Sequence, residues 1–198
     1  MYPQHLSGLL KRWLLDAEHP GVSDVRTCAE IGRHEQPVGV VVTLSDGWRM
    51  VWQAVGSYPP GGAANENPDT PKPEKFDGMW DQLPEYKAAR KADEAAAKAY
   101  TGPRSRKPAA TADAIVALIV DVVKRADHAE IAHVETVRRS PDQPETVRIA
   151  CDDKAMIYGL VAGFMPPGAT SFSHPDHQIP KEFQNVPSVR SVDQQRSR

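Results

Sequence analysis

Apolar residues near the start of the chain recur at steps of three and four, which is the spacing of one face of an α-helix. This stripe runs from Leu6 to Ala17 and ends at His19-Pro20-Gly21, because proline cannot continue a helical hydrogen-bond ladder. Runs rich in β-branched and aromatic residues then predict three strands, at residues 25–33, 38–44 and 48–55. Ser45-Asp46-Gly47 supplies a tight turn between the last two. The pattern predicts a helix followed by an antiparallel strand meander.

The same order of elements returns in the second part of the chain. Thr111 is a good N-cap, and the apolar stripe of the helix after it runs from Ile115 to Ala126. Strand-like segments follow at residues 131–138, 146–151 and 155–164. Each part closes on Pro-Pro-Gly, at residues 59–61 and 166–168.

The residues outside these two parts offer little to bury. Residues 63–76 are mostly Asn, Asp, Pro and Lys, a linker composition, whereas the alanine-rich residues 83–100 favour a helix with a weak apolar face. A polar tail follows the second part, and within it Ile179, Phe183 and Val186 form a possible docking strip. We therefore predict four regions: a first α-β-β-β unit at 1–61, a polar linker with a helix near 83–100 at 62–110, a second α-β-β-β unit at 111–169, and a flexible C-terminal tail at 170–198.

The two parts also match residue by residue. At an offset of 107 residues, Asp46 falls on Asp153, and Pro59-Pro60-Gly61 falls on Pro166-Pro167-Gly168. The helices match at an offset of 109. The sequence therefore predicts an internal repeat and an α+β fold of two tandem α-β-β-β units with antiparallel sheets, related by a pseudo-two-fold axis. The units can pair edge to edge into one sheet or pack helix layer on helix layer, and both arrangements stay open.

Composition narrows the possible partners. The 198 residues carry a net charge of −2, which gives no overall attraction to nucleic acid or to an acidic membrane. We expect Cys28 and Cys151 to be buried, reduced thiols and the chain to be cytoplasmic, because neither a signal peptide nor a membrane-spanning segment is evident.

Candidate catalytic and metal-binding groups have simpler explanations. His174, Asp176 and His177 are potential metal ligands, but they lie in the polar tail with no second ligand cluster nearby in the sequence. Asp152-Asp153 resembles an acid–base pair, yet turn chemistry accounts for Asp153, because Asp46 occupies the same position in the first unit. His19 and His128 both follow a helix, where a histidine suits the helix dipole. We predict no catalytic residue, no metal site and no cofactor.

Two sets of residues are candidates for binding. At least two of the tryptophans are expected in the core, but Trp48, Trp52 and Tyr58 are speculative members of an exposed aromatic patch. A nucleic-acid partner would instead use the basic linker at Arg104, Arg106 and Lys107. It would also need convergence of the strand arginines: Arg26, Arg33, Arg49, Arg138, Arg139 and Arg148.

The run at residues 40–48, the Trp52–Gly56 segment that follows, and the Pro-Pro-Gly endings of both units form one pattern. In this pattern the chain resembles small actinobacterial proteins of mobile elements and prophages. The resemblance covers both units and neither tail. No activity is assigned to that group, so the resemblance implies no catalytic residue.

The function predicted from these observations is a non-enzymatic, cytoplasmic protein-interaction module, encoded by a phage or mobile element. Its partner is another protein or a second copy of itself, bound through an exposed sheet edge or face. Nucleic-acid binding through the strand arginines and the basic linker is the alternative. An enzyme with its site between the two units is the second alternative.

Overall fold

We describe residues 1–33, 38–57, 84–102, 107–138 and 145–170 of a computed structural model. The α+β class with an antiparallel sheet is confirmed. Along the chain the elements are α1 (Pro3–Asp16), β1 (Val22–Thr27), the 3-10 helix η1 (Ala29–Ile31), β2 (Gly39–Leu44), β3 (Arg49–Ser57), α2 (Pro84–Lys98), α3 (Ala112–Ala126), β4 (Ile131–Val137), β5 (Thr146–Cys151) and β6 (Met156–Met165).

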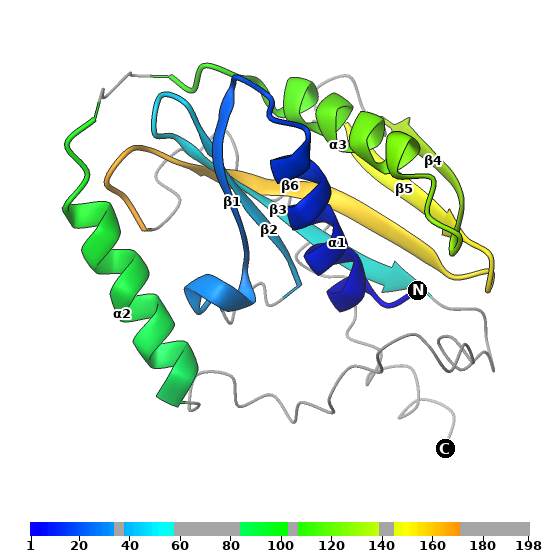
Figure 1. Ribbon diagram of the computed structural model, residues 1–198, viewed down its shortest axis with the longest axis horizontal. Helices are drawn as coiled ribbons and strands as arrows, with labels where there is room; N and C mark the ends of the chain where they lie inside the picture. Colours follow the sequence, from blue (N-terminus) through cyan, green and yellow to red (C-terminus); the bar gives the residue numbers. More distant parts are fainter. Residues whose placement is uncertain (34–37, 58–83, 103–106, 139–144, 171–198) are drawn as a thin grey trace, which may run out of the picture.

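The strands form a single six-stranded sheet in the order β1-β2-β3-β6-β5-β4, with every neighbouring pair antiparallel. We call α1 with β1–β3 the first half and α3 with β4–β6 the second half. The halves meet where β3 pairs with β6, and α1 packs against α3 on the same side of the sheet (Figure 1). Of the two arrangements that the sequence left open, the structure therefore has the edge-to-edge sheet, with α1 and α3 side by side in one layer.

Alternation along the strands divides the buried residues between two faces. We call the face under α1 and α3 the inner face. Apart from the bulges, alternate residues of each strand point toward these helices. They pack against the apolar stripes of the helices in one core, which includes Val42, Trp52, Ile149 and Phe164. This continuous core spans both halves, so each half buries apolar side chains against the other.

The opposite face, which we call the outer face, has a smaller core among the described residues, centred on the first half. Cys28 and Ile31 cover Val41 and Val51 there, together with Met165 from the end of β6. The strand predicted over residues 25–33 is therefore partly wrong, because β1 ends at Thr27 and the chain turns into η1. Gly32, with a φ of 65°, closes that turn in a conformation that favours glycine.

The two halves share local contacts as well as element order. The side chains of Asp46 and Asp153 each accept a hydrogen bond from the backbone N–H two residues later, at 3.1 and 3.0 Å. His19 and His128 likewise accept the N–H two residues later through Nδ1, at 3.1 and 3.3 Å. The edge strands β1 and β4 each carry a register shift after their first residue.

Each aspartate also accepts a hydrogen bond from the segment that precedes the helix of the other half. Asp153 accepts a hydrogen bond from the Met1 ammonium at 2.9 Å, and Asp46 accepts one from the backbone N–H of Ala109, just before α3, at 2.6 Å. Contacts to Met1 and to Ala155 lower the pKa of Asp153, although burial opposes them. These contacts connect the two halves at both ends of the helix pair.

Candidate functional site

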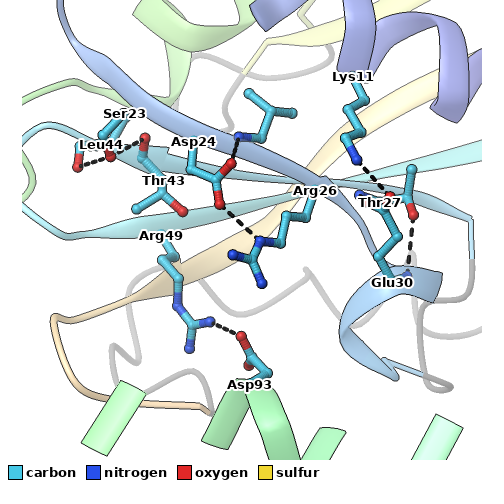
Figure 2. A network of polar contacts seen from close by, with 11 residues as sticks. Lys11, Ser23, Asp24, Arg26, Thr27, Glu30, Thr43, Leu44, Arg49 and Asp93 are labelled. Atoms are coloured by element: carbon cyan, nitrogen blue, oxygen red, sulfur yellow. Dashed lines mark hydrogen bonds and ion pairs between the residues drawn. The ribbon is translucent and has the colours of Figure 1, made fainter. Parts of the chain in front are cut away.

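A cavity of about 140 Å³ lies between α2 and the outer face of the first half. Its floor includes the apolar residues Ile31 and Val41, Ala97 of α2 lies on the opposite side, and its rim is polar. Charged side chains enter it from three elements: Asp24 and Arg26 from β1, Arg49 from β3 and Asp93 from α2. Figure 2 shows the arginines and aspartates of this rim close together.

Arg49 and Asp93 form the inner ion pair of the cavity. The Arg49 guanidinium donates through Nη1 to Asp93 at 2.7 Å (Figure 2). It also donates through Nη2 to the backbone carbonyl of Ala169. Both side chains are only 13% exposed. The pair therefore connects α2, β3 and the segment after β6 in a partly desolvated position, where removing one partner of an ion pair costs more than on an open surface.

Arg26 and Asp24 form the outer ion pair. Arg26 donates through Nε to Asp24 at 2.8 Å, and the two side chains are 54% and 42% exposed. Within the part of the chain that the structure describes, this is the only hydrogen bond of the Arg26 guanidinium. Its two terminal nitrogens therefore still have N–H groups to donate at the mouth of the cavity.

The roof of the cavity is held at both ends by close packing on a glycine. The backbone of α2 at Tyr86 and Arg90 lies where a side chain at Gly32 would be, and the ring of Tyr100 lies where a side chain at Gly47 would be. Gly47 has a φ of 82°, so the turn also needs a residue that accepts this conformation. The alanine-rich helix, whose role the sequence left open, is thus a strap across the first half.

Removing the Asp93 carboxylate should loosen this strap. In Asp93→Ala, Arg49 loses its charged partner in a partly buried site, and we expect attachment of α2 to weaken by about 2 kcal/mol, between the costs for exposed and buried pairs. Amide hydrogen exchange in α2 should then be roughly 10- to 30-fold faster. Glu94→Ala is the matched control, because within the described segments the adjacent Glu94 pairs only with Arg90 of the same helix. Equal exchange rates in the two variants would contradict a role for the Arg49 pair.

The outer face of the second half is a second candidate site. In the described part of the chain, no helix lies on this face (Figure 1). Val55, at the end of β3 where the first half adjoins this face, is 37% exposed, and its neighbours across the β3–β6 pairing, Tyr158 and Leu160, are partly exposed. Arg148 and Glu135 form an exposed ion pair beside them, which lowers the pKa of Glu135.

The sheet edges are poorer candidates than this face. The extra residue of the bulge is Ser23 in β1 and Ala132 in β4, and bulges at an edge hinder pairing with a further strand. At the first bulge the Ser23 hydroxyl lies within hydrogen-bonding distance of the β2 carbonyls of Thr43 and Leu44, at 3.2 and 3.1 Å (Figure 2).

The structure separates the residues singled out from the sequence. Trp48 and Trp52 are buried, which confirms that at least two tryptophans are core and makes the exposed aromatic patch wrong for these two. Both side chains point to the inner face, where the helices cover them. Tyr58, Arg104 and Arg106 lie outside the described residues, as do the tail histidines and the docking strip, and Lys107 is exposed.

The described strand arginines do not converge on one basic surface. Four of them have carboxylate partners: Arg26 with Asp24, Arg49 with Asp93, Arg138 with Asp113 and Glu145, and Arg148 with Glu135. Arg33 is buried beside Met165, and Arg139 lies outside the described residues. Arginines that are neutralised by carboxylates and spread over separate parts of the described structure do not favour nucleic-acid binding.

A site shared by both halves would lie at the contact between α1 and α3. His128 packs against His5 and Trp13 there, with ring centroids 6.2 and 5.8 Å apart, and burial lowers the pKa of His5. A groove nearby is lined by Trp13, Asp16 and Arg125, among other residues of α1 and α3. These groups do not form a nucleophile–base pair or a shared-proton pair, so they favour packing over catalysis.

Comparisons with known proteins leave the family open, because no family model, no curated protein and no solved structure matches this chain. The resemblance to mobile-element and prophage proteins and the cytoplasmic location remain predictions. Among the described helices, none combines the length and apolar character needed to cross a membrane. The described side chains include no cluster of three or more metal-ligating residues.

Proposed function

We propose that this chain is a non-enzymatic protein-interaction module whose partner binds the outer face of the second half. The asymmetry between the two halves carries the proposal. Both halves have the same element order, yet η1 and α2 lie over the outer face of the first half, and no described helix covers that of the second.

The composition of this uncovered face supports the same function. Apolar and aromatic side chains from β3 and β6, including Val55, Tyr158 and Leu160, lie at the middle of the sheet. The exposed Arg148–Glu135 pair lies farther out, on β5 and β4. An apolar centre enriched in aromatic residues with a charged rim is typical of protein interfaces.

We further infer that the two halves are copies of one unit, related by a pseudo-two-fold axis. The offset of 107 residues that matches the strands also separates Gln53 from Leu160, and these two residues pair directly in the sheet. The equivalent turn contacts of Asp46 and Asp153, and of His19 and His128, support the same relation. One unit of roughly 50–60 residues would be only marginally stable alone, and joining two copies in one sheet increases the surface that each buries.

Two exposed apolar residues allow a matched test of the interaction face. Val55 lies on the outer face at 37% exposure, and Leu15 lies on α1 at 41%. A photoreactive amino acid at position 55, in cells that naturally make the protein, should yield a discrete covalent adduct with one partner. The Val55→Glu variant should reduce recovery of that partner by tenfold or more, because the interface would bury an unpaired charge.

The same experiment at Leu15 is the control. Neither the adduct nor loss of the partner is expected for the photoreactive residue at position 15 or for Leu15→Glu. Circular dichroism and thermal unfolding should show that both glutamate variants remain folded. Adducts of equal yield at the two positions, or loss of the partner only in Leu15→Glu, would contradict the proposal.

A further inference from the structure

The cavity under α2 has the construction of a small-ligand site. The apolar part of its lining includes Ile31 and Val41 on the floor and Ala97 of α2 opposite them, which are all buried, and four charged side chains also line it. An apolar pocket with a few placed polar groups is the usual form of such sites. At about 140 Å³, the cavity is smaller than the roughly 300–1,000 Å³ typical of pockets for drug-sized molecules. A ligand there must be small.

The two arginines of the rim differ in what they can still bind. Arg49 uses both of its terminal nitrogens, on Asp93 and on the carbonyl of Ala169. Arg26 uses only Nε, on Asp24. A guanidinium with two available terminal nitrogens presents parallel N–H groups, the geometry that holds a carboxylate through two hydrogen bonds.

We propose that this cavity binds a small monocarboxylic acid with a short hydrocarbon part. The carboxylate lies on the terminal nitrogens of Arg26 at the cavity mouth, and the hydrocarbon part covers Ile31 and Val41 on the floor. The rim contains two arginines and two aspartates, so its charge is balanced. Each further negative charge on a ligand would be repelled by Asp24 and Asp93, which favours a monoanion over a phosphate or a dicarboxylate. This site is independent of the proposed interaction face.

The expected affinity is modest. Arg26 is more than half exposed, so water screens its attraction for the carboxylate, and the apolar contact is small. We expect a dissociation constant on the order of 0.1–1 mM. Binding in this range suits a titration followed by nuclear magnetic resonance.

Butyrate titrated into the full chain provides the test, with butyramide as a neutral probe of the same shape. Butyrate should cause saturable shifts of the Arg26 Nε–H signal and of the methyl signals of Ile31 and Val41, and butyramide should cause much smaller ones. Arg26→Gln should weaken butyrate binding by about tenfold or more, because it removes the charged donor pair. Ala96→Phe, which fills the cavity from α2, should also weaken butyrate binding while Arg26 is retained.

Arg125→Gln is the matched control, because Arg125 is similarly exposed, at 57%, and pairs with an aspartate one helical turn away. This variant should bind butyrate as the parent chain does. Equal shifts with butyramide would show that the carboxylate is not recognised. Equal shifts at Arg26 and Arg125, or unchanged binding in Ala96→Phe, would show that butyrate only pairs with exposed arginines and does not enter the cavity. Each of these results, or the absence of saturable shifts, would overturn the proposal.

Discussion

Gly159→Ala should lower the free energy of unfolding by about 3 kcal/mol or more, enough to unfold a domain of ordinary stability under mild stress. A Cβ added at Gly159 would overlap the six-membered ring of Trp52. Trp52 is fully buried, and Gly159 lies in β6 between β3 and β5, so neither group has room to move. Chemical denaturation, followed by circular dichroism and tryptophan fluorescence, measures the loss.

A double-mutant cycle isolates this contact. Trp52→Phe removes the ring that collides with the new methyl group, and it also removes an indole N–H that has no hydrogen-bond partner within the described structure. Adding Gly159→Ala to Trp52→Phe should therefore cost less than about 1 kcal/mol, which corresponds to a coupling of about 2 kcal/mol. Additive effects of the two substitutions would contradict the steric explanation.

Gly8→Ala is the control for the substitution itself. Gly8 is an exposed residue inside α1, and a Cβ there meets no atom within 4 Å. Alanine should stabilise this helix by about 0.5–1 kcal/mol, because it loses less conformational freedom than glycine on folding. The same exchange is thus expected to have opposite signs at the two positions.

Trp52 and Gly159 occupy equivalent positions in the two halves, at the offset of 107 residues. Both lie beside the Gln53–Leu160 pair, where each half meets the other. Two indoles at this position would compete for the same space, so a large residue in one half requires a small one in the other. Aligning the two halves of the sequence already shows this exchange, because a glycine falls at the position of a tryptophan in strands that are otherwise largely apolar.

Local elements followed closely from the sequence because periodicity and turn residues determine them. The predicted segments at residues 38–44 and 146–151 agree with β2 and β5 to within one residue, and Thr111 caps α3 as expected, accepting the N–H of Ala114 at 3.2 Å. The first strand is shorter than predicted, because an apolar run containing Cys28 and Ile31 suits a 3-10 turn over the outer face as well as a strand.

The candidate sites were harder to predict because they depend on pairing across the chain. The cavity forms where α2 crosses β1 and β3. Two glycines, Gly32 and Gly47, let α2 and Tyr100 approach closely because they have no side chain. A helix made largely of alanine gives no apolar stripe by which to place it. The interaction face likewise becomes visible only when the sheet order is known, since β3 and β6 are far apart in the sequence.

The two cysteines should be almost inert in the folded chain. Cys28 and Cys151 are both buried, and they belong to cores on opposite faces of the sheet. Burial raises the pKa of the Cys151 thiol to about 11 from its ordinary value of 9.0. At pH 8 this lowers its reactive thiolate fraction by roughly 100-fold, before lack of access slows the reaction further. Alkylation of Cys151 in a Cys28→Ala variant, measured by mass spectrometry, should be at least about 100-fold slower in buffer than in urea.

The same shift predicts how stability depends on alkaline pH. The folded state keeps the Cys151 proton that the unfolded state releases near its ordinary pKa of 9.0, so the stabilisation is fully present below pH 9 and is lost as pH rises toward 11. The loss amounts to about 2–3 kcal/mol at most. The free energy of unfolding should therefore fall more steeply between pH 9 and pH 11 in the parent chain than in Cys151→Ala. Parallel curves, or an alkylation rate in buffer within tenfold of that in urea, would show that the Cys151 thiol is neither buried nor shifted in solution.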